Sequence, residues 1–423
     1  MLIEFNFKNY RSFRDEASLS LSAAKITEFG NSVVSIGKEK ILPIAAIYGA
    51  NASGKSNVYN AFAFMTDYVK NSFQYGDDER NYEEIRPDPF LFDDESEQSE
   101  SSFEVFFTIP GDTSGRTYNY GFSLGPEGVI EEWLNTKAKT AKEYKLIFYR
   151  GEGEDDFSGF PKKSRENIQV ALEKQVLIVS LGAKLKVEKC KIVRDWFISN
   201  ELANFGDPVR NFFMSRTLPS KFANDESVQE NVIKFFSSFD DQIKGFKVTK
   251  VLNEDDDKHE QFMIEAKHKK MDSDDYAMIP LGDESDGTLK MFALYPELHN
   301  VMEKGSTFFV DELNARLHPL LVRNLILNFI NPEININHAQ LIFTIHDASQ
   351  LYQFLRRDEI WFTEKDRNGL STLYSLADVT DEDGLHIRKD ENYEKNYLSG
   401  KYGAIPSLSA MNILGGEENG EKR

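Results

Sequence analysis

Residues 49–57 have the sequence Gly-Ala-Asn-Ala-Ser-Gly-Lys-Ser-Asn, which fits the G-x-x-x-x-G-K-[ST] pattern of a phosphate-binding loop. The context fits as well, because an apolar run precedes this segment and a helical pattern follows it. In such a loop successive backbone N–H groups point at a polyphosphate. We therefore expect an ATP site; the alternative is a glycine-rich turn without a ligand. The residues expected to contact the nucleotide are Gly49, Ala50, Asn51, Ala52, Ser53, Gly54, Lys55, Ser56 and Asn57.

Within this loop Lys55 is expected to reach the β- and γ-phosphates, and the Ser56 hydroxyl to bind Mg²⁺. A second candidate metal residue, Asp311, follows the apolar run 307–310, and Glu312 comes directly after it. Strands of an α/β sheet present their carboxyl ends to ligands. We expect Asp311 to hold Mg²⁺ through water and Glu312 to act as the general base for an attacking water. Two solvated acids at an ordinary strand end are the alternative.

Two further motifs are weaker. Thr344-Ile345-His346-Asp347 ends the next apolar run, and a histidine there could sense the γ-phosphate, so His346 is expected to act with Glu312. A structural histidine would look the same. The segment Glu284-Ser285-Asp286-Gly287-Thr288 precedes a helical pattern. Ser285 or Asp286 could simply cap that helix.

The rest of the chain predicts the elements that position these residues. Alternating apolar residues in 1–22 indicate two strands, and short strands with turn signals in 102–149 indicate an antiparallel meander. Helical spacing predicts helices after the loop, between 310 and 340, and over 285–300, and it also dominates 165–243. Strands buried on both faces or paired at an edge are expected at 41–48, 246–252, 261–266, 307–310, 340–345 and 360–363.

This order of elements indicates an α/β fold, with a mixed sheet core, an antiparallel β lobe and an inserted helical lobe. The expected domains are an N-terminal lobe with the loop and meander (1–149), a helical insertion (150–245), and a C-terminal lobe (246–423). Residues 77–100 are expected to form an acidic loop. The polar tail, 385–408, either closes the core as a strand and turn or forms an interaction surface.

Composition limits the classes of function. Of the 423 residues, 40% are hydrophobic, which excludes a wholly disordered chain. A formal net charge of −20 argues against a protein that coats nucleic acid through its overall charge. The lone cysteine, Cys190, allows no intrachain disulfide, and no apolar stretch is long enough to span a membrane. We therefore expect a cytoplasmic protein without a membrane partner.

Together these motifs resemble the ABC-type ATPases of the RecF/SMC/OLD class, and more narrowly the RloA-like or AbiL-type proteins of the AAA_15 and AAA_21 families. The resemblance rests on FNFKNYRSF near the N-terminus, GANASGKSN, ESDGT, DELNARLHP, TIHD and the tail segment 388–406. It implies an ABC-type P-loop ATPase head that binds ATP and Mg²⁺. The segment ESDGT differs from the LSGGQ of transporters, and no sustained heptads indicate an SMC-type arm.

The resemblance also implies a head-to-tail homodimer, with assembly beyond the dimer left open. Ser285 and Gly287 of one subunit would touch the γ-phosphate bound by the other. Residues 314–317 would form the D-loop at the dimer seam, and His346 would be the switch histidine.

Three functions follow as hypotheses. The first is a sensor ATPase of an antiphage abortive-infection system, controlling a separate Toprim-type effector protein. Too few residues follow His346 for a Toprim domain in the same chain, and the acidic run 381–383 is better explained as a solvated turn. The alternative is a RecF-like repair ATPase acting on DNA ends, for which basic clusters at 184–194 and 267–270 could serve. A transporter subunit is disfavoured by the altered signature and the helical insertion.

Overall fold

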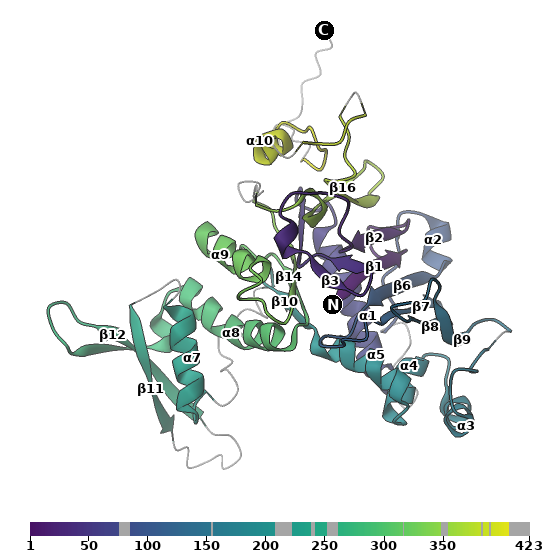
Figure 1. Cartoon of the computed structure of the whole chain (residues 1–423), viewed down its shortest axis with the longest axis horizontal. Coiled ribbons are helices and arrows are strands. Elements are labelled where there is room, and N and C mark those ends of the chain that lie inside the picture. Colours follow the sequence, from purple (N-terminus) through teal and green to yellow (C-terminus); the bar gives the residue numbers. More distant parts are fainter. Residues whose placement is uncertain are drawn as a thin grey trace, which may run out of the picture.

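The computed structural model describes residues 1–75, 85–153, 155–207, 222–237, 242–251, 261–315, 317–347, 354–381, 384–388 and 391–405. Two six-stranded sheets form its body, and a smaller three-stranded sheet with one helix projects from one side (Figure 1). The mixed core sheet and the antiparallel β lobe predicted from the sequence are both confirmed, and with them the α/β P-loop fold class. Among the described residues, no helix is both long and apolar enough to cross a bilayer.

The antiparallel sheet has the strand order β2-β1-β6-β7-β8-β9. Its strands are β1 (Leu2–Lys8), β2 (Ala17–Ser20), β6 (Ser101–Phe107), β7 (Thr117–Gly125), β8 (Gly128–Lys137) and β9 (Lys145–Arg150). Burial alternates strictly along β6, as the sequence pattern predicts for a sheet with one face against a core. The predicted meander is therefore confirmed, with β1 inserted between β2 and β6.

The core sheet has the order β10-β14-β15-β5-β16-β17 and is parallel except for its last strand. Its strands are β5 (Ile44–Gly49), β10 (Glu201–Asn204), β14 (Thr307–Asp311), β15 (Gln340–Thr344), β16 (Ile360–Lys365) and β17 (Ser371–Ser375). Every residue of β5, β14 and β15 is buried, which explains their continuous apolar runs. Because these strands are parallel and adjacent, Gly49, Asp311 and Thr344 end at one edge of the sheet.

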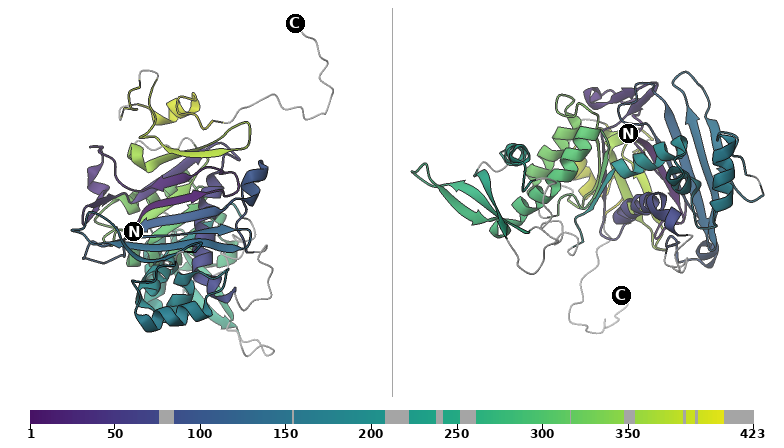
Figure 2. Two further views of the ribbon diagram at one scale, coloured as in Figure 1. Left: turned by 90° about the vertical axis from the view of Figure 1, so that its right-hand side faces the viewer. Right: turned by 90° about the horizontal axis from the view of Figure 1, so that it is seen from below.

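Helix α1 (Lys55–Asn71) lies between the two sheets. Its Phe62 ring contacts Phe5 of the antiparallel sheet at 5.2 Å and Phe309 of the core sheet at 5.7 Å between centroids. The opposite face of the core sheet is covered by α8 (Asp286–Lys304) and α9 (Pro319–Ile330), whose apolar side chains join those of β14 and β15 in a second core. Figure 2 shows these layers edge-on. The phosphate-binding loop therefore begins a helix that is buried on two sides.

The range predicted to be helical, 165–243, contains a strand of the core sheet. Helices α3 (Lys162–Ala171), α4 (Ile178–Lys184) and α5 (Glu188–Ser199) do occur there, and α5 packs against α1. The chain then enters β10, which pairs in parallel with β14. The helical prediction is wrong for Glu201–Asn204, which form β10. A strand of four residues with a polar residue at each end is too short to show an alternating pattern in the sequence. Helix α7 (Glu226–Phe236) follows, with β11 (Ile243–Val251), β12 (Gln261–Lys269) and β13 (Tyr276–Pro280) forming the projecting sheet.

Three peripheral segments complete the fold. Strands β3 (Val34–Ile36) and β4 (Glu39–Ile41) form a small hairpin, so the predicted strand 41–48 is divided in two. In the predicted acidic loop, residues 77–84 lie outside the described part, and α2 (Asp94–Gln98) is a short helix capped by Asp93. The tail contains a short helix, α10 (Tyr393–Leu398), where a strand was the structural alternative. Phe362 of β16 stacks on Tyr397 of this helix with centroids 5.4 Å apart.

Candidate nucleotide-binding site

The phosphate-binding loop connects β5 to α1, as the sequence predicts. Gly54 has φ +115°, and a Cβ there would lie 2.7 Å from Ser371 Oγ, so glycine is required on both counts. A Cβ at Gly49 would lie 2.5 Å from the Thr363 carbonyl oxygen. Ser53 Oγ lies 2.6 Å from Thr363 Oγ1, and Ser371 Oγ donates to the Ser53 carbonyl at 2.7 Å. The strands β16 and β17 therefore fix the loop from one side.

Lys55 is buried, with 4% of its surface exposed. Its Nζ donates to the carbonyl oxygens of Gly49 at 2.7 Å and Ala50 at 2.8 Å, so the ammonium group lies within the curve of its own loop. Burial lowers the pKa of Lys55 to about 8, against the opposing effect of the carboxylates of Asp311 and Glu312. Because these hydrogen bonds go to neutral carbonyls, the buried cation gains from an anion that replaces them.

The two predicted metal residues lie together. Ser56 Oγ donates to Asp311 Oδ1 at 3.1 Å, although the residues are far apart in sequence. Thr344 Oγ1 donates to the same Oδ1 at 2.6 Å, which fixes the orientation of the carboxylate. Burial raises the pKa of Asp311, while the hydrogen bonds from Thr344 and Ser56 act in the opposite direction. A hydroxyl and a carboxylate are hard oxygen donors of the kind that Mg²⁺ takes beside a bound phosphate.

Glu312 and His346 also meet at this edge of the sheet. Their side chains approach to 3.0 Å between Oε1 and Nε2, and both are partly open to solvent. Glu312 has φ +58°, a strained value for a residue other than glycine, and its N–H donates to Thr344 Oγ1 at 2.8 Å. Thr344 therefore holds both acidic residues, through the side chain of Asp311 and the backbone of Glu312. No pattern in the sequence assigns Thr344 a role.

These side chains surround a pocket of about 470 Å³, lined by Asn51, Ala52, Gly54, Lys55, Ser56, Asn57, Glu312, His346 and Lys365. Of the predicted loop residues, Gly49, Ala50 and Ser53 lie behind the lining, where their backbone or side chains support it. Lys365, at the end of β16, was not predicted, because only the pairing of β16 with β5 brings it here. The pocket thus offers two cations to an anionic ligand.

Ser285 and Gly287 do not line this pocket. Ser285 is exposed and caps α8, where its Oγ accepts a hydrogen bond from Thr288 N at 3.1 Å. The simple capping explanation is therefore sufficient for Ser285 within one chain. A contact of this segment with nucleotide would need a second subunit.

The tail contacts the phosphate-binding loop. Ala50 N donates to the Ala404 carbonyl at 3.1 Å, and the Tyr397 hydroxyl donates to the same oxygen at 3.0 Å. The Tyr374 hydroxyl donates to the Tyr402 carbonyl at 2.7 Å. The tail thus supports the loop, and sequence reasoning did not find this contact. Its role as a surface for partners stays a prediction.

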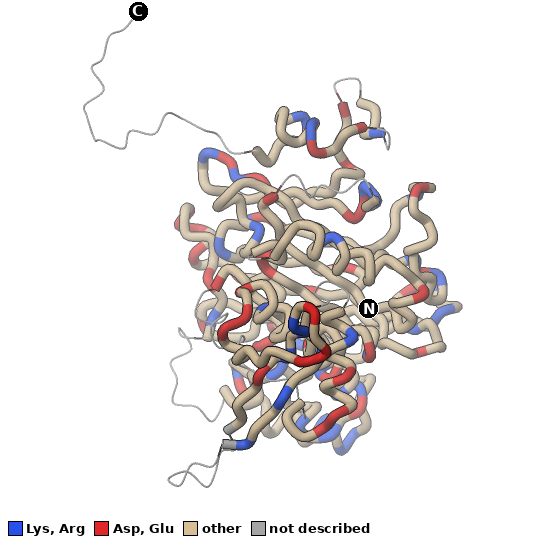
Figure 3. Tube along the Cα trace, turned by 90° about the vertical axis from the view of Figure 1, so that its left-hand side faces the viewer, with Lys and Arg blue, Asp and Glu red and all other residues tan. Residues whose placement is uncertain are grey.

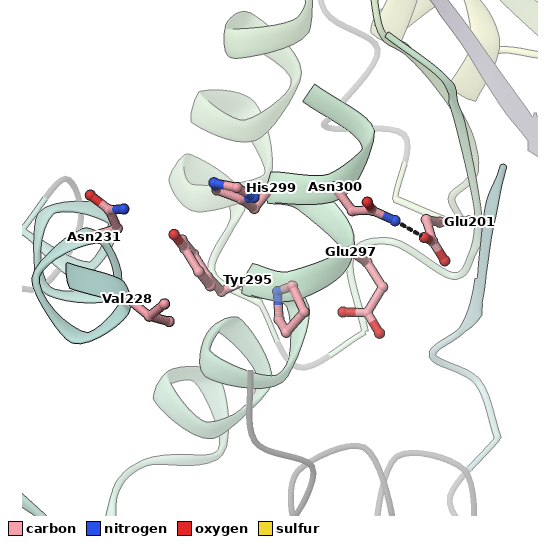
Figure 4. A pocket seen from close by; sticks show the side chains of 8 residues that line it. Glu201, Val228, Asn231, Tyr295, Glu297, His299 and Asn300 are labelled. Atoms are coloured by element: carbon pink, nitrogen blue, oxygen red, sulfur yellow. Dashed lines mark hydrogen bonds between the residues drawn. The ribbon is translucent and has the colours of Figure 1, made fainter. Parts of the chain in front are cut away.

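A second pocket, also of about 470 Å³, lies between β10, α7 and α8 (Figure 4). Glu201 and Glu297 line it, and its lining among the described residues includes no lysine or arginine. None of the predicted site residues contributes to it. Its charge is unfavourable for a polyphosphate, so the pocket at the phosphate-binding loop is the candidate nucleotide site.

Comparison with known proteins gives one family match over most of the chain. A family model described as "AAA domain, putative AbiEii toxin, Type IV TA system" matches residues 44–350, which contain all the predicted site residues. A solved structure titled "Crystal structure of the SmcHead bound to the C-winged helix domain of ScpA" aligns with 91% of this chain and 99% of its own, at 14% identity and a TM-score of 0.47. No curated protein sequence matches the chain.

Proposed function

The chain belongs to the family of AAA domains described as putative AbiEii toxins of type IV toxin–antitoxin systems, and from this premise we propose that it binds and hydrolyses ATP. The observation that carries the proposal is the convergence of Lys55, Ser56, Glu312 and His346 on one pocket, with Asp311 directly behind it in hydrogen-bond contact with Ser56. These residues come from three separate parts of the sequence. A glycine-rich turn without a ligand would not require two distant acidic residues beside it.

The chemistry follows from the positions of the side chains. Lys55 would leave the carbonyl oxygens of its own loop and bind the β- and γ-phosphates, where its charge compensates the negative charge of the transition state. Ser56 and Asp311 would hold Mg²⁺, which supplies charge neutralisation at the phosphates when bound. Glu312 would accept the proton of the attacking water. His346, at 3.0 Å from Glu312, would keep that carboxylate oriented.

We further propose that two copies complete each other's sites head to tail. Ser285 and Gly287 stand outside the pocket of their own chain, and Ser285 is exposed at the start of a long helix. That helix end could donate N–H groups to a γ-phosphate presented by another subunit. ATP binding would then favour the closed dimer only through its greater affinity for that state.

The biological role we propose is a cytoplasmic sensor in an antiphage abortive-infection system. The description of the family, which names a toxin–antitoxin system, favours this role. Of the acidic run 381–383, only Asp381 lies in the described part. We assign the toxic activity to a separate Toprim-type effector that this ATPase controls.

The RecF-like alternative depends on basic surfaces, and the described contacts weaken it. In the cluster at 184–194, Lys184 lies 4.1 Å from the Phe73 ring centroid, and Arg194 donates to the Lys70 carbonyl at 2.8 Å. Lys189 donates to the Gly159 carbonyl. Acidic and basic residues are interspersed on the face seen in Figure 3. These basic side chains make contacts within the chain, so the structure gives little support for a surface that binds the DNA backbone.

One experiment tests the proposed function. Tagged Glu312→Gln is purified from its own host with Mg-ATP, with Lys55→Ala as the matched control that should not bind ATP. We expect ATP turnover to fall by about 100- to 1,000-fold, because the general base is lost, while ATP stays bound in a dimer. A stoichiometric protein with Toprim-like acidic motifs should co-purify. Bound DNA without a protein partner would favour the repair ATPase, and turnover at the wild-type rate would exclude Glu312 as the base.

A further inference from the structure

Lys290 is a buried lysine on α8, five residues after Ser285. Only 9% of its surface is exposed. Its Nζ donates to the carbonyl oxygen of Ala315, and it lies 3.7 Å from the centroid of the Phe205 ring. The ammonium group therefore joins three elements: the helix that begins at Ser285, the end of β10, and the segment after Glu312.

The contacts of Lys290 with Ala315 and Phe205 both lead to the catalytic acids. Ala315 N donates to the Glu312 carbonyl at 2.9 Å, so the turn that Lys290 holds begins at Glu312 itself. Phe205 N donates to the Asp311 carbonyl at 2.9 Å. The next residue, Gly206, lies so close to Glu312 that a Cβ there would be 2.7 Å from the carboxylate carbon. A shift of α8 that moves Lys290 would therefore displace both the turn that follows Glu312 and the residues Phe205 and Gly206 beside it.

A buried ammonium group does not give up its partners freely, because losing them would leave a desolvated charge. When α8 moves, Lys290 must carry Ala315 with it or exchange this carbonyl for another acceptor. Glu312 already has a strained backbone, with φ +58°, so small movements of the following turn would change the direction of its carboxylate. Lys290 thus connects the position of α8 to the turn that begins at Glu312.

We propose that Lys290 is a positioning residue that transmits contact at Ser285 and Gly287 to Glu312 of the same subunit. The inference rests on the proposed head-to-tail dimer. In that dimer Ser285 serves the ATP bound by the partner, while Glu312 serves the ATP of its own chain. Lys290 would therefore couple the two ATP sites, so that hydrolysis becomes cooperative in ATP.

The test compares Lys290→Met with Lys290→Arg and with Lys304→Met, a control at the exposed end of the same helix. Steady-state ATP turnover is measured over a wide range of ATP concentration. For two coupled sites we expect a wild-type Hill coefficient near 2, which Lys290→Met should lower toward 1, with kcat reduced about tenfold and ATP binding to the monomer changed less than about twofold. Lys290→Arg should restore the cooperativity, and Lys304→Met should behave as wild type.

The outcomes separate this inference from the proposed function. If Glu312→Gln forms an ATP-dependent dimer and Lys290→Met remains as cooperative as wild type, the link through Lys290 is wrong and the dimer stands. If Glu312→Gln forms no dimer with ATP, the proposed dimer fails first. Should Lys290→Met not fold, Phe205→Leu removes the ring under the ammonium group and must lower the Hill coefficient. Unchanged cooperativity in that variant would overturn the inference.

Discussion

The pocket at the phosphate-binding loop and the N-terminus of α8 differ in how far one chain completes them. In the pocket, Lys55, Asp311 and Glu312 each have partners before any ligand arrives. At the start of α8, the exposed Ser285 binds only to its own helix turn among its described hydrogen bonds. One region is organised in advance by the fold, and the other presents a surface. In the proposed head-to-tail dimer, ATP binding would then need one chain and hydrolysis two.

Replacing Lys55 should disrupt the preorganised pocket at the phosphate-binding loop and have the largest effect on ATP affinity. Lys55→Ala removes the buried ammonium group, and we expect ATP affinity to fall by about 100-fold or more, since charge-assisted bonds to phosphate are lost. Binding of a fluorescent ATP analogue to the monomer measures this directly. Lys365→Gln, at the open rim of the same pocket, is the control and should lose less than about tenfold. Tight ATP binding by Lys55→Ala would contradict the assignment of the loop.

Gly287→Glu tests the proposed contact between the N-terminus of α8 and a second subunit. It should leave the ATP affinity of the monomer within about twofold, but it would place a carboxylate against the partner's γ-phosphate, at a cost of several kcal/mol. We therefore expect no ATP-dependent dimer by analytical ultracentrifugation, and turnover reduced by about 50-fold. Gly282→Glu is a suitable control, because Gly282 lies just before the same segment and has open space around its Cα. A dimer that survives Gly287→Glu would refute the shared site.

The pH dependence sharpens the comparison further. ATP binding favours charged Lys55, whose pKa is lowered to about 8, so ATP affinity should fall by up to about tenfold per pH unit above 8. The stability of the ATP-free protein should change with pH in the opposite direction. Between pH 8 and 10.5 the unfolded chain keeps a proton on Lys55 that the folded chain has lost. The free energy of unfolding therefore rises with pH in this range, because the cost of burying the charged ammonium group is removed. Titration calorimetry and denaturant unfolding across this range measure both; affinity that rises with pH would contradict the assignment.

The smallest effect is expected in the tail. Tyr397→Phe removes a hydroxyl that donates to the Ala404 carbonyl, and so weakens the support beneath Ala50. Loss of one such bond costs about 1 kcal/mol, which corresponds to roughly a fivefold loss if it acts wholly on ATP affinity. Tyr393→Phe, in the same helix, is the control, because its hydroxyl does not contact Ala404 in the described structure. An equal effect of both variants would mean that the tail acts through stability alone.

The organised region is also the one that the sequence predicts best. Strands β5, β14 and β15 are buried on both faces, so their apolar runs and the acids that follow them are visible without a structure. Lys365 joins the pocket lining through strand pairing, while Thr344 contacts the two acidic residues and Ala404 contacts Ala50 through strand pairing and tail packing. Local sequence patterns hold no information about these contacts. Strand β10 was missed for a similar reason: it is four residues long, and its partner lies about a hundred residues away. Tertiary contacts, rather than local propensity, decide these positions.

The place of β5 in the core sheet has a consequence for the order of synthesis. Its two neighbours, β15 and β16, come from the last quarter of the chain. About 290 residues separate the end of β5 from the start of β15, so at 5–20 residues per second the strand waits roughly 15–60 s on the ribosome without either neighbour. The antiparallel lobe can pair during that interval. The nascent protein should therefore be unable to bind ATP until β15 and β16 have been synthesised, and a chain interrupted before β15 would be inert.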